Sequence, residues 1–488
     1  MGIHRILSKN NILFCWIVYV AVIFTYSFLK NKLSIYVFNE WLIHYDQGFI
    51  RRGLPGTLLL ILHREFGLDI YSVVMTIGYV LLFAFFVAYL YKVKKAIDFL
   101  SIESLLVVLF LPSLVLFPMN TAGMVGRKDF FFFLGFLINL YLVGKFVKDL
   151  RFAIKSQHLQ EKEYRRNTRN LINRYCLQLF IWYNLTSIPV ALSHEAIIFL
   201  AIPINIMITL NLLGLFFTRK QAIIQSLVIF MPTIFVSILF ITFFKEHDID
   251  TLVTMCQSWQ EYMKDSCDES LPKAFIWLSR STLYVIGRNF QFNFKRLNGL
   301  AFPIWISMFL LNIFILTRIS FQTIKKVIKK YGSKDFVKLS QGYVVPIDPV
   351  NILTSFIVKY FFIPMLFSLI LYVIALDWGR WFFLISTLYI FCLMTPSLIY
   401  IELCSNSQQS WISQSLGIAQ PICLRASRKI QIWGRSKYYM TLYFSLVIYA
   451  CFVMEIPAYK LTFQSLHDNP VFKYTVKKTI EFLLDRLQ

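Results

Sequence analysis

The sequence predicts an all-α fold, in the form of a polytopic bundle of membrane-spanning helices. Hydrophobic residues make up 57% of the 488 residues, and the mean hydropathy is +0.61. Apolar runs of roughly 20 residues, the length that crosses a bilayer as a helix, recur along the chain. A soluble domain has no means of burying these runs together with 49 phenylalanines. We therefore expect residues 1–488 to form a single integral membrane domain.

About eleven spans are predicted from the apolar runs and from the Lys and Arg residues that flank them. They cover residues 11–29, 71–91, 99–118, 130–147, 175–191, 196–217, 222–244, 301–317, 355–376, 381–400 and 438–457. Pro346 and Pro349 place the start of the ninth span after them, because proline does not continue a helix. The outer connections are short, apart from one long loop at 245–300. The final segment, 458–488, mixes apolar and basic residues and predicts an amphipathic helix on the outer membrane surface.

The basic residues divide unevenly between the two sets of connections. The N-terminus and the loops near 92–95, 145–174, 218–220, 318–338 and 402–437 hold 28 Lys and Arg residues and five acids. The other set, near 30–69, 119–129, 192–195, 245–300, 377–380 and the tail from 458, holds 20 Lys and Arg residues and 17 acids. The positive-inside rule places the first set in the cytoplasm, so the N-terminus lies inside and the C-terminus outside a bacterial cytoplasmic membrane. The net charge of +23 then mostly reflects topology, and nucleic acid is not an expected partner.

The outer connections carry ionisable residues, although short turns need none to join two helices. The first holds Asp46, Arg51 and Arg52, the second Arg127, Lys128 and Asp129, the third His194 and Glu195, the fourth Arg280 and Arg288, and the fifth Asp377 and Arg380. Charges beside a bilayer are costly and are functional candidates by default. Their presence at one face predicts a shared, water-accessible site. Each residue also has a plainer interpretation, as a headgroup anchor, a helix cap or one half of a local ion pair such as Asp377 with Arg380.

This combination of residues fits sugar transfer from a lipid carrier. Guanidinium groups bind phosphates through two parallel hydrogen bonds, and the residues assigned to a donor diphosphate are Arg51, Arg52, Arg127, Lys128, Arg288 and Arg380. A carboxylate or an imidazole deprotonates the acceptor hydroxyl; Asp46 is the first choice, His194 the second, and Glu195 would orient one of them. Asp129, Asp377 and Arg280 support these residues. Asp46 could instead serve only as the ionic partner of Arg51 or Arg52.

No nucleotide-binding glycine motif occurs, so a nucleotide-sugar donor is less expected. His194-Glu195 is not followed by the second His of a His-Glu-x-x-His zinc motif, and a zinc protease is excluded. No cofactor is indicated, and a divalent metal is left open. Cys256 and Cys267 share the long outer loop, where an oxidising compartment and a short separation predict a structural disulfide.

The layout resembles the membrane glycosyltransferases of the glycosyltransferase-C superfamily, and also the O-antigen and capsule polymerases of bacterial polysaccharide clusters. The similar features are about eleven spans, an acid in the first outer loop (Asp46) and arginines in later outer loops (Arg280, Arg288, Arg380). The resemblance implies transfer of a hexose or oligosaccharide at the outer face, as in lipopolysaccharide assembly, with Asp46 as the catalytic acid of the first loop. The chain departs from the superfamily because Gln47 replaces a second acid after Asp46 and because no large soluble outer domain follows. In the polymerases, outer-loop arginines carry the site instead.

Two other function classes remain open. A transporter or flippase for a lipid-linked or anionic solute should carry ionisable residues near its span centres and show repeated halves. The predicted span centres are nearly free of charge, which favours chemistry at one face. A glycan acyl- or phosphotransferase would use a similar layout, with His194 as the base. The partners expected for the sugar transferase are a lipid-linked saccharide donor, its acceptor and membrane lipids.

Overall fold

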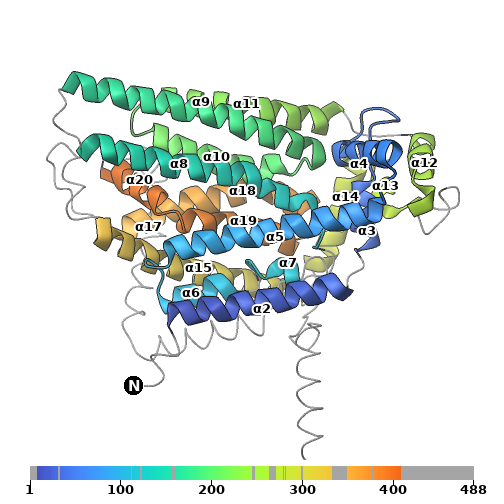
Figure 1. The fold of residues 1–488 in the computed structure, drawn as a ribbon, viewed down its shortest axis with the longest axis horizontal. Coiled ribbons are helices and arrows are strands. Elements are labelled where there is room, and N and C mark those ends of the chain that lie inside the picture. Colours follow the sequence, from blue (N-terminus) through green and yellow to red (C-terminus); the bar gives the residue numbers. More distant parts are fainter. Residues whose placement is uncertain are drawn as a thin grey trace, which may run out of the picture.

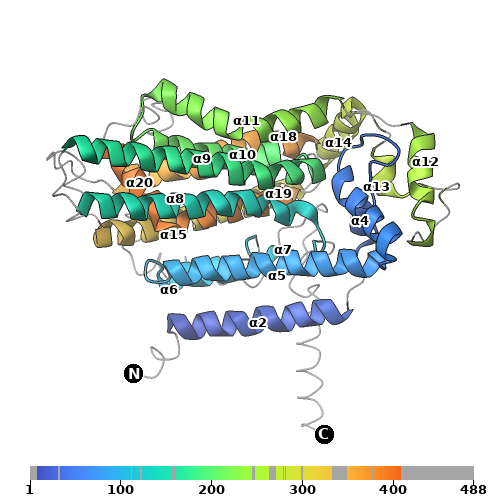
Figure 2. The ribbon, with the colours of Figure 1, turned by 45° about the horizontal axis from the view of Figure 1, so that its top comes forward.

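The computed structural model describes residues 8–30, 33–111, 113–120, 124–155, 161–243, 248–262, 267, 271–278, 280, 282–297, 301–331, 349–374 and 378–407. Within these ranges every regular element is a helix, so the predicted all-α class is confirmed. The long helices run side by side along one direction and form an elongated bundle (Figures 1 and 2). Several of these helices are long and strongly apolar, as expected of a membrane-embedded protein.

The bundle packs around one large apolar core. Its helices are α2 (Lys9–Lys30), α5 (Ile70–Ala96), α6 (Ile102–Phe110), α7 (Phe117–Asn120), α8 (Phe132–Lys155), α9 (Glu161–Ser193), α10 (Ile197–Leu213), α11 (Arg219–Phe243), α15 (Ala301–Tyr331), α17 (Pro349–Ile357), α18 (Ile363–Ile374), α19 (Trp378–Leu393) and α20 (Pro396–Ser407). Helix α9 packs against both α8 and α11, and α10 packs against α11 and α18. Every residue of α19 is buried, whereas α5, α9 and α11 expose large apolar side chains such as Phe83, Leu185 and Phe235. The exposed apolar side chains fit a lipid surrounding.

Five helical stretches are long and apolar enough to cross a membrane. They are Ile70–Ala96, Lys128–Ala153, Arg166–Ser193, Arg219–Phe240 and Pro349–Tyr372. The bent pair α19 and α20 makes a sixth if it is taken as one span, and two shorter apolar stretches lie in α2 (Lys9–Thr25) and α10 (Ile197–Leu213). The described part of the chain therefore does not give the predicted count of about eleven.

Two of the predicted spans differ because an apolar run does not always form one straight helix. The predicted span 99–118 divides into α6 and the short α7, and the sequence places Pro112 and Pro118 in this run, where proline disfavours a continuous helix. The predicted span 381–400 bends by 76° between α19 and α20. The predicted eleventh span, 438–457, and the surface tail, 458–488, lie outside the described residues.

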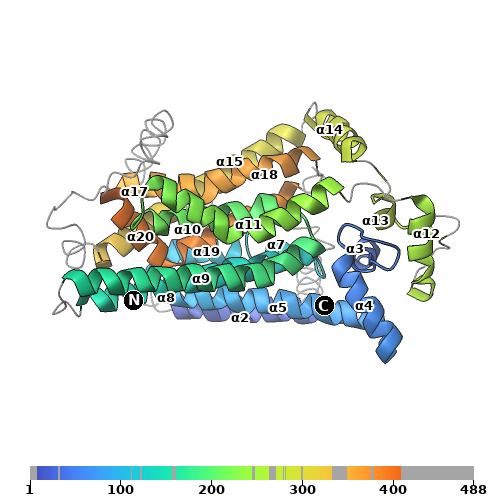
Figure 3. The same ribbon diagram turned by 90° about the horizontal axis from the view of Figure 1, so that it is seen from above.

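A smaller lobe lies at one end of the bundle. It contains α3 (Ile35–Trp41), α4 (Gly53–Phe66), α12 (Ile249–Gln257), the 3-10 turn η2 (Gln260–Tyr262) and α13 (Lys273–Ile276). In Figure 3, α3, α4, α12 and α13 lie together beyond the ends of most of the long helices. Residues 33–69 and 248–278, which we call the end lobe, build a second apolar core that includes Trp41, Leu252 and Trp259. The two predicted outer loops are therefore largely helical, and α14 (Thr282–Leu297) continues from them to pack against α15 and α18.

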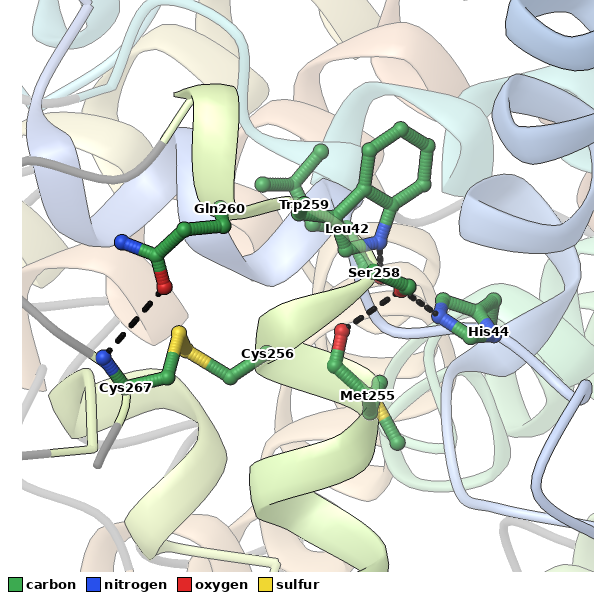
Figure 4. Close-up of a disulfide and its surroundings, with 8 residues drawn as sticks. All are labelled: Leu42, His44, Met255, Cys256, Ser258, Trp259, Gln260 and Cys267. Carbon is green, nitrogen blue, oxygen red and sulfur yellow. Dashed lines mark hydrogen bonds between the residues drawn. A yellow bond between two sulfur atoms is a disulfide. The ribbon is translucent and has the colours of Figure 1, made fainter.

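A disulfide between Cys256 and Cys267 lies within the end lobe, as the sequence predicted (Figure 4). Their Cα atoms are 5.8 Å apart, and both side chains are buried in the second core. Close by, the indole Nε1 of Trp259 donates a hydrogen bond of 2.8 Å to the carbonyl oxygen of Leu42. The disulfide closes a loop within the second segment of the end lobe, and this hydrogen bond joins that segment to the first.

Candidate functional site

Charged side chains from five segments meet where the bundle joins the end lobe. They come from α3 (Glu40), the turn before α4 (Arg51, Arg52), the turn leading into the 3-10 helix η1 at Lys128–Phe131 (Arg127, Lys128, Asp129), the turn between α9 and α10 (His194, Glu195) and the first turn of α19 (Arg380). We call these nine residues the charged cluster. Four of the five predicted outer groups thus contribute to it. Glu40 is an addition that the sequence analysis did not single out.

Arg52 is the centre of the more exposed part of the cluster. Its Nε and Nη2 donate to the two carboxylate oxygens of Glu195 at 2.9 and 2.7 Å, and its Nη1 donates to Glu40 at 3.0 Å. Pairs that use two parallel charge-assisted hydrogen bonds are among the stronger ones in proteins. Arg52 therefore connects α3 of the end lobe to the turn between α9 and α10 of the bundle.

The backbone at Arg52 adopts a left-handed conformation. Its φ of +65° is the one positive value at a non-glycine residue in the described ranges. Such a conformation is unfavourable for a residue with a Cβ and persists where the surroundings impose it, frequently at functional sites. A Cβ at the next residue, Gly53, would lie 2.3 Å from the ring of Tyr45. This close packing fixes the entry into α4, with the Arg52 side chain paired with Glu195.

A second turn brings Arg127 and Lys128 into the cluster. Gly126 permits this turn because its φ is +81°, a value that L side chains rarely adopt. Beyond it, Arg127 Nη1 donates to the Glu40 carboxylate at 3.1 Å. Lys128 Nζ donates to the backbone carbonyl oxygens of Glu40 and Arg52, at 2.7 and 3.4 Å. Glu40 thus accepts hydrogen bonds from two guanidinium groups, and Lys128 holds the backbone of both neighbouring segments.

Asp129, His194 and Arg380 form the more buried part of the cluster. Asp129 Oδ1 lies 3.5 Å from His194 Nε2, and Oδ2 lies 3.5 Å from Arg380 Nη1. The Asp129 side chain is 1% exposed, against 26% for that of Arg52. The backbone N–H of Ala196 donates to His194 Nδ1 at 3.3 Å, so a neutral imidazole carries its hydrogen on Nε2, which faces Asp129. His194 thus turns an N–H toward the Asp129 carboxylate at 3.5 Å.

The protonation states follow from burial and from neighbouring charge. Burial lowers the pKa of His194 well below its usual value, Arg52 and Arg380 lower it further, and the opposing effect of Glu195 is smaller. Burial by itself would raise the pKa of Glu195, but the ion pair with Arg52 outweighs burial and holds that pKa well below its usual value. At pH 7 the imidazole is therefore neutral and Glu195 is ionised.

The formal charges in the cluster do not balance. Its three carboxylates, Glu40, Asp129 and Glu195, face four arginines and one lysine. A concentration of positive charge in a partly buried place attracts anions. The cluster is thus suited to an anionic ligand.

Arg51 lies at the edge of the cluster with an unused donor. Its Nη2 donates to the carbonyl oxygen of Trp277 at 3.3 Å, while its buried Nε makes no hydrogen bond with any residue that the structure describes. Burial lowers the pKa of Arg51, Glu195 opposes this change, and the nearby charge of Arg52 adds to it. Two guanidinium groups therefore share the neighbourhood of one carboxylate, Glu195.

Asp46, the first choice for a catalytic base, lies apart from this arrangement. It is exposed, and its Oδ2 pairs with Nη2 of Arg64 in α4 at 2.8 Å. Its expected ionic partners, Arg51 and Arg52, instead contact Trp277 and the two glutamates described above. The structure thus places Asp46 on the surface of the end lobe.

The arginines of the long connection also lie outside the cluster. Arg288 is exposed, with its guanidinium 5.3 Å from the ring centroid of Trp277. Arg280 is exposed as well and stacks over Tyr284 at 5.1 Å. Asp377 lies outside the described residues. Of the five arginines expected to line one diphosphate site, Arg52, Arg127 and Arg380 pair with carboxylates of the cluster. Arg51 lies at the edge of the cluster, and Arg288 lies against Trp277 outside it.

A second buried polar group lies inside the bundle. Lys359, in the π-helical turn η3 (Val358–Phe362), and Glu402 of α20 form an ion pair of 2.7 Å, and both side chains are 0% exposed. Asn211 of α10 donates to Glu402 Oε2 at 2.7 Å and accepts from Lys359 Nζ at 3.0 Å. Ser355 of α17 also donates to Glu402. The expectation that the span centres are nearly free of charge is therefore wrong at this position.

A simple count would have revealed Lys359. The two sets of connections hold 28 and 20 of the 49 Lys and Arg residues, and the one left over is Lys359. Glu402 was assigned to a connection because the predicted span ended at residue 400. Glu40 gave no comparable signal, because its contacts depend on how α3 packs.

Comparison with known proteins gives no relative, since no known family, no curated protein and no solved structure matches the chain.

Proposed function

We propose that the protein is a membrane glycosyltransferase or polysaccharide polymerase. It takes its sugar from a polyprenyl-diphosphate carrier at the outer face of a bacterial cytoplasmic membrane. The charged cluster is the observation that carries this proposal, because it joins an excess of basic side chains to a buried carboxylate at one end of a helical bundle. A carrier lipid has the matching chemistry, with an apolar tail for the bilayer and a diphosphate for the cluster.

The basic residues of the cluster bind and neutralise the diphosphate. Arg51, Arg52, Arg127 and Arg380 present planar forks that match phosphate oxygens, and Lys128 adds a further N–H donor. Negative charge grows on the diphosphate as the sugar leaves it. Fixed cations placed at developing charge are usually the largest contribution to catalysis in such sites.

Asp129 is the carboxylate best placed to act as the base. The imidazole of His194 and the guanidinium of Arg380 each lie 3.5 Å from one of its oxygens, whereas Asp46 is exposed on the end lobe. Asp129 accepts the proton of the acceptor hydroxyl as that oxygen bonds to the anomeric carbon. The bond from the anomeric carbon to the diphosphate breaks, and its electron pair leaves with the diphosphate.

Replacing Asp129 with Asn tests this assignment in cells. The amide keeps the shape of the side chain and removes the charge, so surface glycan should fall while the lipid-linked donor accumulates. Asp46→Asn is the matched control, because it makes the same chemical change at an exposed ion pair and should leave glycan synthesis near normal. If glycan synthesis is normal with Asp129→Asn and is lost with Asp46→Asn, the base is Asp46 of the first outer loop and not Asp129.

A transporter for a lipid-linked or anionic solute is the second candidate. The Lys359–Glu402 pair, the π-helical turn around Lys359 and the 76° bend before α20 favour it, because buried ionisable pairs and broken helices recur in transporters. The double variant Lys359→Met with Glu402→Gln separates the two functions. A transferase, once folded, should keep its activity without this remote pair. A folded double variant that abolishes glycan assembly in cells would favour the transporter.

A further inference from the structure

We propose that Glu195 is an internal occupant of the anion site. In the resting protein its carboxylate fills the Arg52 fork at which the donor diphosphate binds, and the donor displaces it. The identity of the ligand rests on the proposed function. The exchange itself rests on the geometry of Arg52, Glu195 and Arg51.

The edge of the Arg52 guanidinium formed by Nε and Nη2 is already filled by a carboxylate. Nε and Nη2 engage both oxygens of Glu195, with contacts of 2.9 and 2.7 Å, and Nη1 engages Glu40 at 3.0 Å. Phosphate oxygens bind an arginine fork through the same two-point geometry as a carboxylate. A diphosphate can therefore use this edge of Arg52 only by taking the place of a carboxylate.

Glu195 is the more readily displaced of the two carboxylates. Its side chain is 18% exposed and belongs to a turn between two helices, whereas that of Glu40 is 9% exposed and belongs to α3. Glu40 accepts from both Arg52 and Arg127, while the hydrogen bonds to the Glu195 carboxylate come from Arg52. The Arg52 side chain is 26% exposed, so a small anion in solution can reach the pair.

Arg51 indicates that the incoming anion is larger than a carboxylate. Its buried Nε makes no hydrogen bond with a described residue, and its charge lies close enough to Arg52 and Glu195 to interact with both. The Glu195 carboxylate is engaged by Arg52 and leaves the Nε of Arg51 without a hydrogen bond. A diphosphate has enough oxygens to engage both, so the site should prefer pyrophosphate to inorganic phosphate.

Binding of pyrophosphate to the purified, full-length protein in detergent tests the exchange. Glu195→Gln removes the competing charge and retains the size of the side chain. If Glu195 occupies the fork for about nine-tenths of the time, its removal should lower the Kd for pyrophosphate about ten-fold. Asp46→Asn makes the same charge change away from Arg52 and should leave the Kd within about two-fold of wild type. Arg52→Lys keeps the charge but lacks the fork and should bind pyrophosphate more weakly.

The outcomes separate this inference from the proposed function. If the wild type binds pyrophosphate and Glu195→Gln binds it no more tightly, Glu195 is only a structural clamp and the inference is wrong. If neither protein binds pyrophosphate, the diphosphate site is wrong as well. Should Glu195→Gln fail to fold, Glu195→Asp keeps the charge but withdraws the carboxylate by one methylene. It is also expected to bind pyrophosphate more tightly than wild type, and unchanged or weaker binding would contradict the exchange.

Discussion

The Arg52 guanidinium meets both carboxylate oxygens of Glu195, although 143 positions in the sequence separate the two residues. This ion pair joins the end lobe to the membrane-embedded bundle. It lies one residue along the chain from His194, whose imidazole faces the buried Asp129. A shift of the Arg52–Glu195 pair would therefore change the position of the end lobe and also that of His194, next to the proposed base Asp129.

The neutral state of His194 predicts how stability depends on pH. In the unfolded chain a histidine titrates near about pH 6.5, whereas in the folded protein the pKa of His194 lies well below that value because of burial and nearby cations. Below about pH 6.5 the unfolded chain therefore takes up a proton that the folded protein does not, so stability is full above this pH and falls below it. Thermal unfolding midpoints at about pH 7.5 and about pH 5.5 should show this fall in the wild type and a smaller fall in His194→Gln.

His63→Gln is the control for that measurement. His63 lies on the end lobe, where its imidazole pairs with the exposed Glu261, so this variant shows what the loss of a histidine outside the cluster does to the same measurement. The pKa of His44 is also lowered, mainly by burial. His44 should therefore contribute part of the fall in the unfolding midpoint in every variant. An identical fall in wild type and His194→Gln would show that His194 is not held neutral.

Gly56→Ala should destabilise the end lobe. A Cβ at Gly56 would lie 2.0 Å from the carbonyl oxygen of Ile43, which is backbone and has little room to move. We expect a loss of about 1–3 kcal/mol, as for other overpacked substitutions. Gly287→Ala is the control, because a Cβ there meets nothing within 4 Å and alanine is favoured over glycine in a helix such as α14. Equal thermal midpoints for the two variants would show that α4 does not pack as described.

The disulfide should stabilise the end lobe by about 3 kcal/mol, as the closure of a short loop predicts. Cys256 and Cys267 are 11 positions apart. Mass spectrometry of non-reduced peptides should find them linked, and Cys256→Ser should lower the thermal midpoint under oxidising conditions. Cys176→Ser changes a free cysteine of α9 and serves as the control. Two free thiols in protein from an oxidising compartment would rule the disulfide out.

The buried ion pair of Lys359 and Glu402 predicts that replacing either residue alone lowers the stability of the protein strongly. Lys359→Met or Glu402→Gln leaves an unpaired polar group in a fully buried place, and each should cost about 3–5 kcal/mol. The double variant removes both charges and should recover most of that loss. A double-mutant cycle of unfolding midpoints measures this coupling. Additive losses would mean that the two side chains do not interact.

The helical class could be predicted from the sequence because apolar run length and composition decide it locally. The number of spans could not, since a hydropathy window does not detect the 76° bend before α20 or the break after α6. A hydropathy window also does not detect the short helices of the end lobe, so the sequence predicted both of its segments as loops. Their helices are short and are held by a second core whose two halves lie far apart in the sequence.

The candidate site was predicted in outline. A row of charged outer connections indicated that Arg52, Arg127, His194 and Arg380 would share one end of the bundle. The partners of each residue depend on packing, so the sequence did not separate Asp46, which pairs with Arg64 on the surface, from the buried Asp129. Glu40 was not predicted for the same reason, because only the packing of α3 places it between Arg52 and Arg127.

The charged cluster is proposed to form a glycosidic bond, and product formation in detergent micelles tests this proposal most directly. Purified full-length protein is mixed with lipid-linked saccharides extracted from host cells that lack it, and the products are identified by mass spectrometry. The wild type should lengthen or transfer the saccharide and release polyprenyl diphosphate, and Asp129→Asn should be slower by roughly 10²–10⁴-fold, the usual contribution of a positioned base. A detergent micelle does not separate two compartments, so transport cannot occur in it. A transporter would also form no new bond in this mixture. Folded wild-type protein that yields no product from this mixture would contradict the account.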